Sequence, residues 1–133
     1  MKHILFVCIE NSNRSQMAQA FANMYGSGDV KTYSAGSRPS GKVNPKAIAA
    51  MKELGYDLQM HKSKALDKLP DIEFDYAITM GCGDACPLVR AKHRLDWTIP
   101  DPRDMDEDEF RKVRNMIRDK VKDVLNKMNT END

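Results

Sequence analysis

Cys8, Arg14 and Ser15 are spaced so that together they could hold an anion and attack it. A loop formed by the residues between Cys8 and Arg14 can wrap once around a tetrahedral oxyanion, with its backbone N–H groups pointing inward. The planar guanidinium of Arg14 could grip two oxygens, and Ser15 could add a hydroxyl donor. The same positive field would stabilise a thiolate nucleophile at Cys8. The residues expected to bind the oxyanion are Ile9, Glu10, Asn11, Ser12, Asn13 and Arg14.

The segments on either side of this loop can hold it in place. Residues 3–7 form an apolar run typical of a buried strand, and residues 15–25 carry apolar side chains at helical spacing. The loop would therefore run from a strand into a helix, whose N-terminus carries a partial positive charge that favours a bound anion.

The rest of the chain continues this alternation of strands and helices. Further strands are expected at residues 30–35, 74–80 and 97–99. Further helices are expected at residues 47–54, after an Asn44-Pro45 cap, and at residues 106–125. The polar stretch 81–94 is predicted to be a loop or a short helix.

This alternation predicts an α/β fold with right-handed crossovers. We expect a single three-layer domain, residues 1–133, with a four-stranded parallel sheet and helices on both faces. The ligand site of such a sheet lies at the carboxyl ends of the strands. Cys8, Cys82 and Asp101 each follow the end of an expected strand, so they should meet at one edge.

Composition excludes several classes of partner. The 133 residues are 41% hydrophobic and 31% charged with a formal charge of +1, which suits one globular unit that binds no nucleic acid. The apolar run at residues 4–7 is too short for a signal or a membrane span, so a cytoplasmic protein is expected. We also expect a monomer. The three histidines are scattered, so we expect no metal or other cofactor and interpret His61 as a structural hydrogen-bonding residue.

The loop at Cys8 is one of several motifs that carry a resemblance to a known family. The others are Thr32-Tyr33-Ser34-Ala35-Gly36, Val43-Asn44-Pro45-Lys46-Ala47 and Asp101-Pro102. Over nearly its whole length, the chain resembles the low-molecular-weight protein tyrosine phosphatases and the arsenate reductases that share their fold. The resemblance implies that Cys8 is the nucleophile, that Arg14 holds the oxyanion and that Asp101 is the general acid. An acid at the same sheet edge could protonate a departing oxygen.

Cys82 and Cys86 favour the reductase branch of this family. Reducing arsenate takes two electrons, so an arsenic adduct on Cys8 must be resolved by a second thiol, a role that suits Cys82. Cys86 could then attack Cys82 and move the disulfide outward, and Gly81 and Gly83 would permit the backbone change. The resemblance implies arsenate as the substrate and thioredoxin as the electron donor. A low-molecular-weight thiol such as mycothiol or glutathione is an alternative donor.

Three positions depart from the family pattern. Arg103 follows Asp101-Pro102 where phosphatases often carry an aromatic residue that walls the phosphotyrosine pocket, which favours a small inorganic oxyanion here. Glu10 stands where the family usually has glycine, and Asn13 stands where a further cysteine often occurs.

A potassium site is not expected. Some of these reductases bind potassium through an asparagine, a serine and two carboxylates. Asn11 and Ser34 match this set, but Gln19 and Lys64 occupy the carboxylate positions. Lys64 would supply the missing positive charge.

Two other functions stay open at this point. One is a tyrosine-type phosphatase whose extra cysteines protect or regulate it by oxidation. The other is a non-enzymatic thiol sensor for As(III) or a soft metal, which would have no use for Arg14 or Asp101.

Overall fold

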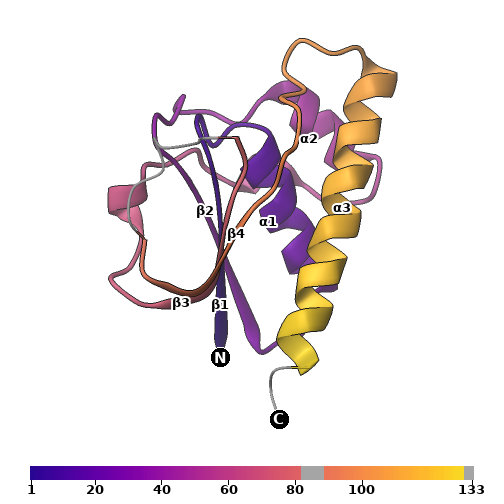
Figure 1. The fold of residues 1–133 in the computed structure, drawn as a ribbon. Coiled ribbons are helices and arrows are strands. Elements are labelled where there is room, and N and C mark those ends of the chain that lie inside the picture. Colours follow the sequence, from indigo (N-terminus) through magenta and orange to yellow (C-terminus); the bar gives the residue numbers. More distant parts are fainter. Residues whose placement is uncertain (82–88, 131–133) are drawn as a thin grey trace.

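A parallel β-sheet forms the centre of the computed structural model, which describes residues 1–81 and 89–130 (Figure 1). The elements in chain order are β1 (Lys2–Cys8), α1 (Arg14–Tyr25), β2 (Val30–Gly36), α2 (Pro45–Lys52), the 3-10 helices η1 (Leu58–Met60) and η2 (Leu66–Lys68), β3 (Phe74–Thr79), β4 (Ala91–Asp96) and α3 (Glu107–Thr130). The four strands lie in the order β2-β1-β3-β4, and each neighbouring pair is parallel. The expected α/β class and four-stranded parallel sheet are confirmed.

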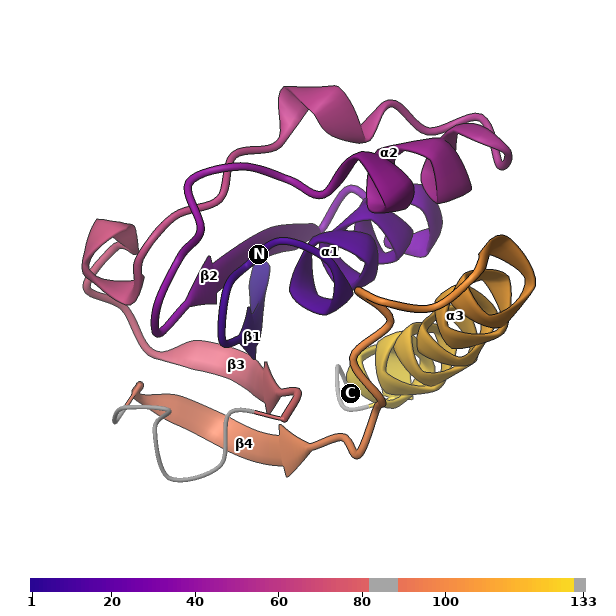
Figure 2. The same ribbon diagram turned by 90° about the horizontal axis from the view of Figure 1, so that it is seen from above.

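The three α-helices lie together on one face of the sheet (Figure 2). Ile4, Phe6 and Ile78 point toward them from the central strands and are fully buried. Helix α3 adds a buried stripe at the expected spacing of three and four residues: Phe110, Val113, Ile117, Val121, Val124 and Leu125. This apolar layer holds α1 against β1, and so fixes both ends of the loop that joins them.

The opposite face of the sheet has a smaller core. Leu5, Val7 and Phe74 are buried there, and they are covered by Leu66 of η2 and by Leu69 just after it. The three-layer expectation therefore holds with a qualification. Within residues 1–81 and 89–130, the second face is covered by a 3-10 helix and extended chain, while every α-helix packs on the first face.

The prediction for the fourth strand was wrong. The strand is β4, which begins inside the stretch predicted to be a loop or short helix and ends at Asp96, and residues 97–99 follow the strand. β4 pairs only with β3, at the sheet edge, and most of its side chains are exposed, so its sequence carries no apolar alternation. Trp97 and Ile99 are apolar because the chain leaves the sheet here and crosses the main core toward α3.

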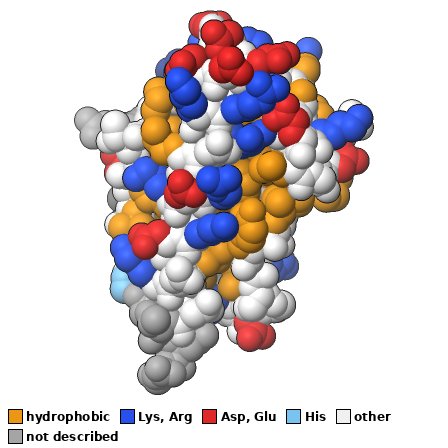
Figure 3. Space-filling view, turned by 90° about the vertical axis from the view of Figure 1, so that its right-hand side faces the viewer, with side chains coloured by type: hydrophobic (Ala, Val, Ile, Leu, Met, Phe, Trp, Pro, Cys, Tyr) orange, Lys and Arg blue, Asp and Glu red, His pale blue; other side chains and the backbone are white. Residues whose placement is uncertain are grey.

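Charge is distributed along α3 as its dipole favours. Acidic side chains gather where the helix begins, at Glu107, Asp108 and Glu109, and basic side chains lie beyond them (Figure 3). Negative charge near a helix N-terminus is stabilising. None of the helices described in the structure is both long and apolar enough to cross a membrane.

Candidate active site

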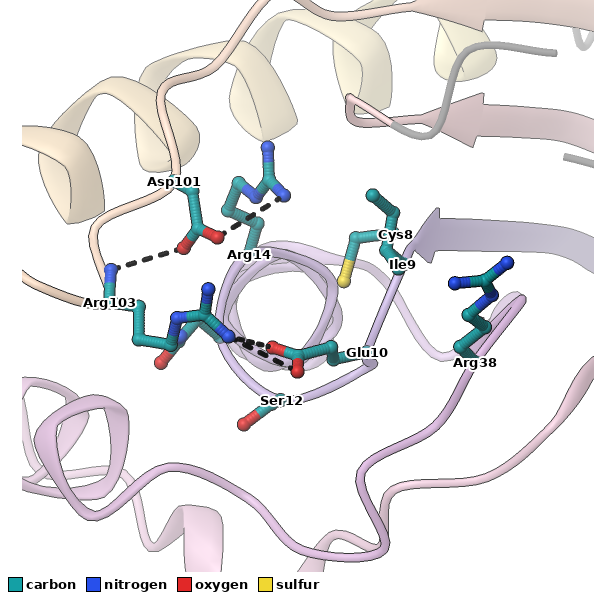
Figure 4. Close-up of a pocket in the computed structure, with 9 residues that line it drawn as sticks. Cys8, Ile9, Glu10, Ser12, Arg14, Arg38, Asp101 and Arg103 are labelled. Atoms are coloured by element: carbon teal, nitrogen blue, oxygen red, sulfur yellow. Dashed lines mark hydrogen bonds and ion pairs between the residues drawn. The ribbon is translucent and has the colours of Figure 1, made fainter. Parts of the chain in front are cut away.

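The turn from β1 into α1 forms the floor of a pocket of about 260 Å³ at the carboxyl end of the sheet (Figure 4). The pocket is lined by Cys8, Ile9, Glu10, Ser12, Asn13, Arg14, Arg38, Asp101 and Arg103. Pockets for drug-sized ligands span roughly 300–1,000 Å³, so this one is small. It suits a compact anion better than a large organic substrate.

The carbonyl groups of the loop are turned outward by neighbouring segments. Arg38 N donates to Ile9 O at 2.7 Å, Ser40 N donates to Glu10 O at 3.0 Å, and Ser63 Oγ donates to the same Glu10 oxygen at 3.0 Å. No acceptor in the described part of the chain takes the backbone N–H groups of residues 10–13. These N–H groups are therefore free to bind an anion.

Asn11 gives the loop its sharp curvature. Its φ of 51° lies in the left-handed region, which asparagine tolerates better than most residues do. Its side-chain oxygen accepts from Lys64 N and from Gln16 Nε2, both at 2.9 Å, so the unusual conformation is held by two bonds. Asn11 is fully buried and acts on the pocket from behind.

Gly36, at the end of β2, lies directly under this loop. A Cβ built there would stand 2.6 Å from Ile9 O and 2.9 Å from Asn11 N, closer than real Cβ atoms approach. Only glycine lets β2 and the loop come this close. The glycine at the end of the motif Thr32-Tyr33-Ser34-Ala35-Gly36 is therefore required for steric reasons.

A chain of hydrogen bonds ends at the sulfur of Cys8. Asn11 Nδ2 donates to Ser15 Oγ at 2.7 Å, so the hydroxyl proton of Ser15 remains available for Cys8 Sγ at 2.9 Å. Gln16 Nε2 in turn donates to Asn11 Oδ1. The bonds from Gln16 to Asn11 and from Asn11 to Ser15 both run toward Cys8, so the sulfur can accept from the Ser15 hydroxyl. A thiolate is the better acceptor, and this agrees with a nucleophilic role.

His61 continues this chain toward the surface. Its Nδ1–H donates to Gln16 Oε1 at 2.9 Å, and its Nε2 accepts from the Tyr56 hydroxyl at 2.6 Å. Tyr56 itself accepts from Asn23 Nδ2 at 2.8 Å, which leaves its own proton for His61. Burial, helped by the charge of Lys64, lowers the pKa of His61 to about 4, so the ring is neutral at pH 7. The structural role expected for His61 is confirmed.

His61→Gln is expected to flatten the acid limb of the stability profile. As the pH falls from about 6.5 to about 4, the His61 ring becomes protonated in the unfolded wild-type chain but stays neutral in the folded chain. The folded state therefore loses stability across that window. The free energy of unfolding is measured with urea at pH 7, 5.5 and 4.5. Its slope against pH should be steeper for the wild type than for His61→Gln, by up to the slope that about one bound proton gives. Identical slopes in the two proteins would contradict this account.

Arg14 and Asp101 come from distant parts of the chain and face the same space. Arg14 is nearly buried, and its Nη1 donates to Ile99 O at 2.9 Å. Its Nη2 lies 4.0 Å from Asp101 Oδ2. The structure thus brings Cys8, Arg14 and Asp101 together as the sequence predicted, with Ser15 behind Cys8.

Cys82 and Cys86 lie outside the described residues. The last described residue before them, Gly81, has a φ of 78°, and a Cβ there would stand 2.5 Å from Arg14 Nη1. The chain that leaves β3 therefore passes directly against the arginine of the pocket before it reaches Cys82.

Arg38 and Arg103 line the pocket but were not among the predicted site residues. Arg103 was noted only as a departure from the family, and Arg38 was missed altogether. Arg38 lines the pocket, and its backbone N–H holds Ile9 O. The only signal for it was its position just after β2, at the same carboxyl edge of the sheet as Cys8.

The positions compared above with potassium ligands are engaged by other groups of the chain. Ser34 Oγ donates to Gln19 Oε1 at 2.6 Å, and the side chain of Asn11 bonds to Ser15 and Lys64 N. Burial lowers the pKa of Lys64.

Comparison with known proteins defines the class. Residues 3–133 match the family model described as low molecular weight phosphotyrosine protein phosphatase, and the chain belongs to that family. It is 34% identical over 131 residues to the glutaredoxin arsenate reductase of Synechocystis sp., a match that covers 96% of this chain and 99% of the relative.

Solved structures give the same picture. The fold matches that of an arsenate reductase in the phosphate binding state with a TM-score of 0.85 and 34% identity, over 96% of this chain and 98% of the other. It also matches a thioredoxin-dependent arsenate reductase of Corynebacterium glutamicum with a TM-score of 0.80 and 30% identity, over 98% of this chain and 63% of that one.

Proposed function

We propose that this protein is an arsenate reductase that uses thioredoxin as its electron donor. The observation that carries the proposal is the small pocket in which Cys8 faces unpaired loop N–H groups, Arg14 and Asp101. Arsenate has the tetrahedral shape and negative charge of phosphate, and one structural relative is an arsenate reductase in the phosphate binding state.

In the first step, the Cys8 thiolate attacks arsenic. An S–As bond forms, one As–O bond breaks, and the departing hydroxyl group takes a proton from Asp101 and leaves as water. Arg14 and the loop N–H groups hold the other oxygens as their charge is redistributed. The product is an As(V) adduct on Cys8.

In the second step, the Cys82 thiolate attacks the sulfur of Cys8. A disulfide forms between them, the S–As bond breaks, and its electron pair stays on arsenic, which leaves as arsenite. Cys86 then attacks Cys82, which forms a Cys82–Cys86 disulfide and releases the Cys8 thiolate. The close approach of Gly81 to Arg14 supports this relay, because Gly81 is the residue directly before Cys82 and it lies against the arginine of the pocket.

Thioredoxin would supply two electrons to the Cys82–Cys86 disulfide and restore both thiols. The Corynebacterium relative is thioredoxin-dependent, whereas the Synechocystis relative is a glutaredoxin arsenate reductase. Glutaredoxin with a low-molecular-weight thiol is therefore the alternative donor. The cycle needs a reducing compartment such as the cytoplasm, which keeps free thiols reduced.

The test is arsenate-dependent NADPH oxidation with thioredoxin and thioredoxin reductase, measured for the wild type and for Cys8→Ser, Cys82→Ser and Cys86→Ser. Each variant is expected to lose steady-state turnover. Cys86→Ser should still release one arsenite per chain, because Cys8 and Cys82 suffice for one reduction, whereas Cys82→Ser should release none. Unchanged turnover in Cys82→Ser or Cys86→Ser would reject the relay.

A phosphatase is the second candidate, because ester hydrolysis needs only the pocket residues Cys8, Arg14 and Asp101 and the family takes its name from that reaction. It predicts that an aryl phosphate is hydrolysed equally well by the wild type, Cys82→Ser and Cys86→Ser. It also predicts no arsenate-dependent NADPH oxidation.

A further inference from the structure

We propose that Glu10 and Arg103 form an ion pair that positions Asp101 over the bound oxyanion. This inference rests on the proposed function, because it assigns Asp101 the protonation of the departing oxygen. Arg103 Nη1 lies 3.0 Å from Glu10 Oε2 and 3.2 Å from Oε1. The pair joins the oxyanion loop to the loop that carries Asp101, and both partners line the pocket (Figure 4).

On one side, the pair is anchored to rigid backbone. The carbonyl oxygen of Glu10 accepts from Ser40 N and from Ser63 Oγ, both at 3.0 Å. The start of its side chain is therefore fixed relative to Cys8, two residues earlier. Because Arg103 pairs with Glu10, its position is also fixed relative to Cys8.

On the other side, Arg103 is coupled directly to the acid. Its backbone N–H donates to Asp101 Oδ1 at 3.1 Å, so the placement of residue 103 sets the orientation of that carboxyl group. Lys46 Nζ holds Arg103 O at 3.0 Å from the side of α2. Arg14 holds Ile99 O, two residues before the acid. The Glu10 contact adds a further tie at the pocket rim, beside Arg14, whose Nη2 lies 4.0 Å from Asp101 Oδ2.

Charge explains why the two residues need each other. Glu10 puts a carboxylate in a loop built for anions, and such a charge repels a dianionic substrate unless it is neutralised. Figure 4 shows Glu10 between Arg103 and Arg38, with the dashed contacts made only to Arg103. The pair is about half exposed, so it adds little to folding stability. Its effect is expected in catalysis.

A purely electrostatic role would give a different pattern from a positioning role. If only charge mattered, Glu10→Gln would lower KM, Arg103→Gln would raise it, and kcat would hardly change. If the pair positions Asp101, both variants lower kcat. General acids contribute roughly 10²–10⁴-fold, so partial misplacement should cost about tenfold.

The test is a mutant cycle that includes the acid. Glu10→Gln and Arg103→Gln should each lower kcat for arsenate by about tenfold, and Glu10→Arg combined with Arg103→Glu should recover most of it. In an Asp101→Asn background, Glu10→Gln should cause no further loss. Arg118→Gln, which removes the Arg118–Asp119 pair on α3, serves as the matched control. A tenfold loss that persists in Asp101→Asn, or effects on KM alone, would overturn the proposal.

Aryl phosphates separate this inference from the proposed function. Phenolate is a poorer leaving group than p-nitrophenolate and needs the acid more, so Glu10→Gln should slow phenyl phosphate hydrolysis more than p-nitrophenyl phosphate hydrolysis. A merely structural defect would slow both equally, and that result would also overturn the proposal. This readout needs neither arsenate nor thioredoxin. A wild type that hydrolyses the esters but reduces no arsenate would end the proposed function and leave the cycle measurable.

Discussion

Arg14→Lys is expected to lower kcat/KM for arsenate by about 10²–10³-fold, although the positive charge is kept. Lysine cannot reproduce the planar fork that spans two oxygens of a tetrahedral anion. It also cannot both face the pocket and hold Ile99 O, the bond that secures the segment before Asp101. The loss should therefore appear in both kcat and KM.

Steady-state kinetics with a coupled reductant checks this expectation. Arg118→Lys on α3, whose ion pair with Asp119 lies outside the pocket lining, is the matched control. If Arg14→Lys kept its activity within about threefold of the control, charge alone would bind the substrate, and the fork geometry would have no role.

Gly36→Ala is expected to reduce arsenate turnover by about 10²-fold, although Gly36 is not among the residues that line the pocket. The added methyl group would overlap Ile9 O and Asn11 N and push the loop away from β2. Displacement of catalytic groups by about 1 Å can cost this much, and overpacking costs about 1–3 kcal/mol of stability. Gly28→Ala is the control, because a Cβ at Gly28 meets nothing within 4 Å.

Kinetics and urea unfolding together separate the two effects. Gly36→Ala should stay folded at 25 °C yet bind phosphate weakly, while Gly28→Ala should match the wild type in both measurements. A Gly36→Ala protein with full activity would mean that the loop can move aside without losing its anion geometry.

Much of the fold could be predicted because buried elements leave periodic patterns. The apolar run of β1 and the stripe of α3 both became core, as their spacing indicated. β4 could not be predicted in this way, since most of its side chains are exposed. β2, the strand at the other edge of the sheet, buries its carboxyl end and could be predicted. Trp97 and Ile99 looked like a strand because a chain crossing the core is as apolar as one inside the sheet.

The site was predictable to the extent that one loop carries it. Cys8 and Arg14 share that loop, so their spacing was informative. Arg38 and the link from His61 to Gln16 depend on contacts between segments far apart in sequence, and these leave no local pattern. Glu10 and Arg103 each looked like a separate departure from the family, and only the fold shows that they are one pair.

The polar side chains of β4 also disfavour association between copies of this protein through the exposed edge of the sheet. An outer strand offers unpaired backbone groups on which another sheet could grow, and charged side chains discourage such growth. Lys92, His93 and Arg94 are exposed along this strand, and Lys92 lies 3.6 Å from Asp75 on β3. Aliphatic residues in β4 would have made the strand easy to recognise from the sequence, but they would also have created an edge prone to aggregation.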